Sequence, residues 1–152
     1  MTRPAADDGV VRQAIYEAFA AGGAPPTRAD IAERAALPPA RVSASYERLA
    51  EARVLVLDAG TREVMMAMPF SAVPTAFRVR AADRAWWANC AWDAFGIAAA
   101  TGCDVDVETA CADCGESMTV AVRAGAGAPL ATAAVAHFAV PAARWWEDIG
   151  FT

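Results

Sequence analysis

Apolar residues recur at helical spacing through the first third of the chain. From Asp8 to Ala21 they fall every three or four positions, and the glycine pair that begins at Gly22 ends the pattern. Thr27 follows two prolines and is a typical N-cap for a second helix, expected to run to about Leu37. A second proline pair then opens a third helix, which runs to about Ala50. The pattern predicts three consecutive helices.

Beyond the third helix the pattern alternates with a period of two, which is typical of strands. We expect strands at Val54–Leu57 and Glu63–Met68, joined by a turn at residues 58–61. Three helices and a hairpin in this order are similar to a winged helix-turn-helix. Residues 69–75 are predicted to form a stiff connector, because they contain two prolines, which fix φ and lack a backbone N–H.

A second apolar region follows this connector. The stretch Trp86–Ile97 is apolar on nearly every side, so we expect a mostly buried helix from about Asp83 to about Ala100, with Gly102 at its end. The other elements expected here are strands at Ala76–Arg80, Cys103–Val107, Ser117–Val122 and about Ala134–Val140, and a short helix from Ala142 to about Ile149.

These elements together predict an α+β fold. Residues 1–68 are expected to form a winged helix-turn-helix-like domain of three helices, and residues 69–75 a linker. Residues 76–152 are expected to form a second domain, in which an antiparallel sheet packs on a buried helix.

Composition narrows the function classes. Hydrophobic residues make up 57% of the 152 positions and charged residues 20%, which indicates a globular chain. No apolar run reaches the roughly 18 residues that a membrane-spanning helix needs, and the N-terminus does not read as a signal peptide. We therefore expect a cytoplasmic protein without a membrane partner. In that compartment four cysteines indicate thiols or metal ligands rather than disulfides.

Charge bears on whether the helical domain binds DNA. The net charge of −5 argues against a broad nucleic-acid surface, because phosphate binding needs clustered cations. Acidic residues are interleaved among the arginines that could reach phosphates, which are Arg28, Arg34, Arg41 and Arg48. A scaffold or lid is therefore favoured for this domain, and DNA is kept as the alternative partner.

Cys90 and Asp93 interrupt the apolar stretch of the expected central helix. At a spacing of three residues they share one helix face and lie within reach of each other. A buried carboxyl group is costly unless it is hydrogen-bonded or retained for chemistry. A thiolate next to an acid can hold a soft metal and deliver a proton beside it.

The residues around this pair resemble the organomercurial lyase (alkylmercury lyase) family. The resemblance is strongest in Ala88–Phe95, in register with the Pro69–Thr75 connector before it. It extends to the winged-helix-like segment, to Cys111–Val122 and to the closing stretch His137–Trp145. Members of this family cleave a carbon–mercury bond and give a hydrocarbon and Hg(II). The resemblance implies that Cys90 and Asp93 both lie at the metal, with Cys90 as the first mercury ligand and Asp93 also as the proton relay. It further implies mercury as substrate and no cofactor.

One departure from the family concerns its second catalytic cysteine. Where that thiol is expected, this chain has Ala133 or Ala134. A substitute thiol would have to come from Cys103, Cys111 or Cys114, if the fold brings one of them to Cys90.

The remaining metal-ligating residues have alternative interpretations. Cys111 and Cys114, followed by a glycine, have the spacing of half a zinc knuckle, so they are candidate ligands for zinc or copper. A reducible pair and plain core cysteines are the alternatives. His137, the only histidine, is interpreted as a structural residue, with a ligand or base as the alternative.

Three functions are consistent with these residues. The first is an organomercurial lyase that acts on a small organometal compound with the help of thiols. The second is a relative without turnover that binds a soft ion such as Hg(II) or Cu(I), as a sequestering protein or a metal-responsive regulator. The third is an enzyme that uses a reactive Cys90 on another small molecule.

Overall fold

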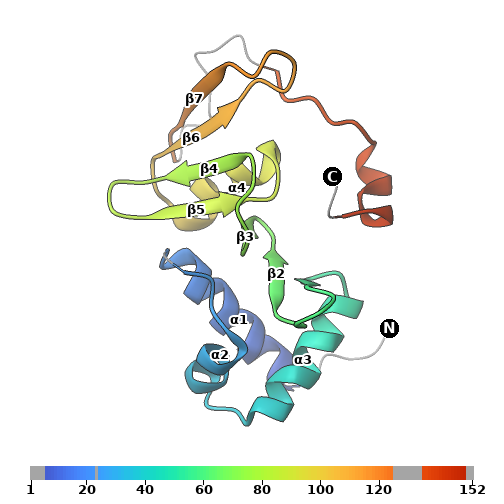
Figure 1. Ribbon diagram of the computed structural model, residues 1–152. Coiled ribbons are helices and arrows are strands. Elements are labelled where there is room, and N and C mark those ends of the chain that lie inside the picture. Colours follow the sequence, from blue (N-terminus) through green and yellow to red (C-terminus); the bar gives the residue numbers. More distant parts are fainter. Residues whose placement is uncertain (1–5, 23, 125–134, 150–152) are drawn as a thin grey trace.

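Figure 1 shows the computed structural model, which describes residues 6–22, 24–124 and 135–149. Three helices gather at one end of the molecule: α1 (Ala6–Ala20), α2 (Arg28–Ala35) and α3 (Pro39–Glu51). Thr27 caps α2 as the sequence predicts, since its hydroxyl accepts a hydrogen bond from the Asp30 N–H and its own N–H donates to the Asp30 carboxylate at 2.8 Å. The predicted order of three helices and a hairpin is present.

A core of apolar side chains holds the three helices together. Val11 and Ile15 of α1, Ile31 of α2 and Val42 of α3 are all fully buried. The spacing of these residues places them on the inner face of each helix, which is the physical reason that the pattern predicts the helices well.

The strands form one antiparallel sheet of seven strands in the order β1-β2-β3-β5-β4-β6-β7. Their bounds are Val56–Leu57 (β1), Val64–Ala67 (β2), Phe70–Ser71 (β3), Phe77–Arg80 (β4), Ala85–Ala88 (β5), Val105–Ala110 (β6) and Ser117–Val122 (β7). Helix α4 (Ala91–Thr101) packs on β4 and β5 (Figure 1) and buries Ala94, Ile97 and Ala98. The predicted α+β class, with an antiparallel sheet packed on a helix, is confirmed.

The segment expected to be only a connector contains strand β3. Phe70 and Ser71 pair with β2 on one side and with β5 on the other. Phe70 is buried and stacks on Phe19 of α1, with 5.6 Å between ring centroids. The prolines before and after this short strand do not interrupt the ladder, because they lie outside the paired residues. One sheet therefore runs through residues 69–75, while the division into two domains remains a prediction.

The expectation of a helix from about Asp83 is wrong for its first part. Ala85–Ala88 form strand β5, in which Trp86 and Ala88 are buried and their neighbours are half-buried. This period of two, together with the preference of tryptophan for strands, outweighs the helix-forming alanines. The Trp86 indole N–H also donates to the Phe19 carbonyl at 2.7 Å, which fixes the strand against α1.

The C-terminal region also departs from expectation. Val135–Val140, the described part of the strand expected over 134–140, forms no strand. Ala142–Glu147 forms a 3₁₀ helix, η1, at the place of the short helix expected over 142–149. Ala133 and Ala134 lie outside the described residues. No helix in the described ranges combines the length and the apolar character needed to cross a bilayer.

Candidate functional site

Cys90 lies at the junction between β5 and α4. Its backbone is extended, with φ −151° and ψ −179°, and it is the N-cap residue of the helix. The thiol is therefore at the helix N-terminus, one residue before the first helical turn, and not on the face of a continuous helix as the sequence pattern predicts. The residue is half-buried and its thiol is free.

Asp93 lies in the first turn of α4, and Asn89 holds its carboxyl group in place. The Asn89 side-chain amide Nδ2 donates to Asp93 Oδ2 at 3.1 Å and to the Phe70 carbonyl at 3.3 Å. Asn89 thus connects the acid to strand β3. Sequence reasoning missed Asn89, although its spacing of four residues from Asp93 was a usable signal.

Burial raises the pKa of both candidate reactive groups. Desolvation is the main cause for Cys90, and the neighbouring Asp93 charge adds to it, while the backbone N–H groups of Asp93 and Trp92 work in the opposite direction. Desolvation also raises the pKa of Asp93, against the lowering effects of Asn89 and of the Cys90 thiol. Both groups therefore hold their protons to higher pH than usual.

Tyr16 of α1 brings the helical region to the same site. Its hydroxyl donates to the Met68 carbonyl at 3.1 Å. Burial is the largest cause of its raised pKa, and the charge of Asp93 contributes to it, so the two side chains interact electrostatically. The sequence carried no signal for this interaction, because the two residues belong to distant helices.

A cavity of about 230 Å³ adjoins the thiol. Its walls come from the end of β5, from the start of β4 and from the C-terminal segment: Phe77, Asn89, Cys90, Ala91, His137, Phe138, Ala139, Val140 and Trp145. Phe138 and Trp145 lie 5.4 Å apart between ring centroids, and the Trp145 indole N–H donates to the Val140 carbonyl at 2.9 Å. The cavity thus combines one thiol and one imidazole with aromatic and aliphatic side chains.

The tryptophans divide between packing, solvent and this cavity. Trp86 is buried in the core, whereas Trp92 is 66% exposed on the first turn of α4. Trp145 is the tryptophan that lines the cavity, which suits an apolar organic group.

Cys103 is held away from Cys90 by the length of α4. The helix has 11 residues, which span about 16 Å, and the two cysteines flank its opposite ends. The Arg84 guanidinium donates to the Cys103 sulfur at 2.8 Å, and the thiol donates to the Thr101 carbonyl at 3.4 Å. These contacts make Cys103 a packing residue at the end of the helix.

Cys111 and Cys114 lie at the turn of the β6–β7 hairpin and do not line the cavity. Gly115, with φ +74°, closes this turn by donating its N–H to the Cys111 carbonyl at 2.9 Å. Backbone N–H groups of Cys114 and Asp113 lower the pKa of Cys111. Across the part of the chain that the structure describes, no three His, Cys, Asp or Glu residues are grouped to hold a metal ion. The structure therefore separates this pair from Cys90 and Asp93, and a metal bound there remains a prediction.

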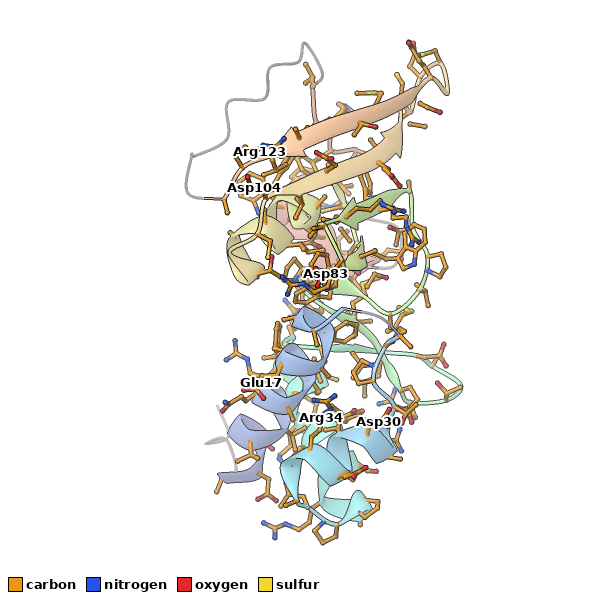
Figure 2. The ribbon with its side chains drawn as sticks, turned by 90° about the vertical axis from the view of Figure 1, so that its left-hand side faces the viewer. Glu17, Asp30, Arg34, Asp83, Asp104 and Arg123 are labelled. Atoms are coloured by element: carbon orange, nitrogen blue, oxygen red, sulfur yellow. The ribbon has the colours of Figure 1, made fainter. Side chains whose placement is uncertain are left out.

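The arginines considered for DNA contact mostly engage carboxylates. Arg28 pairs with Glu63, Arg41 with Asp7 and Arg48 with the buried Asp8. Figure 2 shows the fourth, Arg34, on the same helix as Asp30. The surface of these helices is thus of mixed charge.

Comparison with known proteins identifies the family of this chain. The family model for alkylmercury lyase (MerB) matches residues 70–152, which include β3, Cys90, Asp93 and the cavity. A solved structure, the mercury-bound form of MerB2, is similar with a TM-score of 0.64 and 26% sequence identity, over 85% of this chain and 60% of that one. The chain thus spans about three fifths of that relative's length, and no curated protein matches its sequence. The family match covers more than half of the chain, which therefore belongs to the alkylmercury lyase family.

Proposed function

We propose that the protein cleaves the carbon–mercury bond of a small organomercurial by protonolysis. The products are Hg(II) and a hydrocarbon. Cys90 supplies the thiolate that binds mercury, and Asp93 relays the proton. Cellular thiols then remove Hg(II) from the protein.

The first step in this proposal is capture of the organomercurial cation by the Cys90 sulfur. Hg(II) is a soft ion and prefers thiolate to oxygen ligands. Because metal binding requires the thiolate, the Cys90 proton is released as the Hg–S bond forms. Asp93 is the adjacent group that can accept this proton, because its raised pKa makes it a better base than an ordinary aspartate.

The second step is proton transfer to carbon. Sulfur donation weakens the carbon–mercury bond and places electron density on the carbon. That carbon takes the proton from Asp93, and the electron pair of the broken bond becomes the new C–H bond. Mercury keeps its oxidation state, so no oxidant or reductant is needed.

The observation that carries this proposal is the pairing of a half-buried thiol with a half-buried acid beside a cavity. Asn89 holds the acid at 3.1 Å, and the organic group has aromatic walls against which to pack. Soft-metal binding alone leaves the carboxyl group beside the thiol without a role in proton transfer.

The test is an anaerobic assay of the reduced protein with methylmercury or phenylmercury and excess thiol. We expect catalytic release of methane or benzene, measured by gas chromatography, above the rate of the thiol alone. Mercury binding without hydrocarbon release would contradict the proposal.

A second candidate function is soft-metal binding without turnover. It is favoured by the lack of a second cysteine among the described residues that line the cavity, since Cys103, Cys111 and Cys114 all lie elsewhere. In that case Hg(II) or Cu(I) would bind at Cys90, and the protein would act in sequestration or regulation. Stoichiometric metal binding in the assay above, with no hydrocarbon, would support this function.

A further inference from the structure

The cavity beside Cys90 is also lined by a second metal-ligating side chain. Cys90 comes from the β5–α4 junction, and His137 comes from the segment that precedes η1. They are far apart in the sequence, so no motif joins them. His137 is exposed rather than packed in the core, which departs from its interpretation as a structural histidine.

A third polar group of the same cavity is not satisfied. The side-chain oxygen Oδ1 of Asn89 is buried, and no donor among the described residues reaches it. A buried acceptor without a partner costs folding free energy, which is typical of functional sites. The cavity is therefore lined by a thiol, an imidazole and an amide whose buried oxygen has no donor among the described residues.

An imidazole is a suitable second donor for mercury. Its neutral ring nitrogen is softer than carboxylate oxygen and is a common ligand of soft and borderline metals. His137 is also close in sequence to Ala133 and Ala134, where the family resemblance places the second thiol. The same segment thus contributes a nitrogen donor to the lining of the cavity.

We infer that Cys90 and His137 together form a sulfur–nitrogen site for the mercury atom of a small organomercurial. The Cys90 thiolate makes the first bond, and the neutral His137 ring nitrogen adds to the same mercury atom as a second donor. The organic group then lies against Phe77, Phe138 and Trp145. The volume of about 230 Å³ exceeds the roughly 150 Å³ in which an enclosed apolar cavity holds benzene, so the size of the site does not exclude a phenyl group.

This inference rests on the proposed function for the identity of the ligand, but its test measures binding and not turnover. The probe is methylmercury, added to a variant in which Cys103, Cys111 and Cys114 are serine, so that Cys90 is the only thiol. Because His137 is the only histidine in the chain, its ring protons are identified in the NMR spectrum without ambiguity. We expect both ring resonances to shift and to saturate at one equivalent of methylmercury.

Two variants in the same background separate ligation from general disturbance. His137→Asn should weaken methylmercury binding at least tenfold in a competition titration with a small thiol. Val135→Asn introduces the same side chain at an exposed position of the same segment that does not line the cavity, and it should bind like the parent. Added imidazole should restore part of the affinity to His137→Gly and leave the parent unchanged.

The outcomes distinguish this inference from the proposed function. Unshifted ring resonances at saturating methylmercury, or equal affinity of His137→Asn and the parent, would overturn the sulfur–nitrogen site, even if methane is released. Shifted resonances and weaker binding by His137→Asn would support it, even if no methane is released.

Discussion

The two thiol sites of this protein lie in opposite environments. Cys90 is half-buried at the start of α4, and burial next to Asp93 raises the pKa of its thiol. Cys111 lies at a hairpin turn beside the exposed Cys114, and backbone N–H groups lower the pKa of its thiol. The hairpin thiols should therefore react with any soft electrophile, whereas Cys90 is suited to a ligand that fits its cavity and uses the neighbouring acid. Mercury binding alone does not distinguish the two sites, but hydrocarbon release does.

The strongest contrast is expected from removing each thiol in turn. Cys90→Ser should reduce hydrocarbon release to the background of free thiol, because the mercury ligand is lost. The double variant Cys111→Ser/Cys114→Ser should keep the wild-type rate and lose only part of the total mercury bound. A rate that falls with the hairpin pair and survives the loss of Cys90 would reverse the assignment of the two sites.

Asp93 should matter for turnover more than for binding. In Asp93→Asn the amide cannot relay a proton, and general acid–base groups contribute about 10²–10⁴-fold to a rate. We expect kcat for methane release to fall by that factor, while methylmercury binding to Cys90 changes little. Asp113→Asn, in the hairpin turn, is the matched control and should keep wild-type kcat. Unchanged turnover in Asp93→Asn would show that another group carries the proton.

Alkylation should show the difference in thiol pKa directly. The thiolate is the reactive form, and each pKa unit changes its fraction about tenfold below the pKa. At pH 7 iodoacetamide should therefore modify Cys111 faster than Cys90. Peptide mass spectrometry of quenched time points measures both rates in one sample. Equal rates, or faster modification of Cys90, would mean that burial does not protect the Cys90 thiol.

The Asp93 carboxyl group should also make the free energy of unfolding depend on pH. Its pKa is raised above 3.8 in the folded protein, so the folded state binds the proton more tightly than the unfolded state does. The free energy of unfolding should fall as pH rises from this ordinary value through the folded pKa. Asp93→Asn cannot ionise at this position, so it avoids this loss of stability and should melt at a higher temperature than wild type at pH 7. The difference in melting temperature should narrow as pH is lowered toward 3.8. A lower melting temperature for Asp93→Asn throughout this range would contradict the raised pKa.

Local patterns sufficed for much of the fold. Thr27 has the side chain that a helix N-cap needs, and Ser117–Val122 alternate so regularly that β7 has the predicted bounds. Local patterns failed where pairing with distant strands decides whether a segment forms a helix or a strand. Ala85–Ala88 contain helix-forming alanines, but pairing with β3 and β4 and the burial of Trp86 make them a strand.

Only those residues of the candidate site that are close together in the sequence could be predicted. Cys90 and Asp93 are close in the sequence, so their proximity follows from spacing even though the helix begins later than expected. Tyr16, Phe77 and His137 reach the site from other elements, and no periodicity encodes such contacts. Asn89 lies between these cases, since its position is local but its second hydrogen bond, to Phe70, depends on β3.

The most direct test of protonolysis at Cys90 is the isotopic composition of the released methane. The reduced Cys111→Ser/Cys114→Ser variant is equilibrated in D₂O and given methylmercury with excess thiol, and the gas is analysed by mass spectrometry. Proton relay through Asp93 predicts CH₃D with one deuterium per molecule, one Hg(II) released per methane, and no product above background from the same variant with Cys90→Ser. Methane without deuterium, or equal release after loss of Cys90, would contradict protonolytic cleavage at this site.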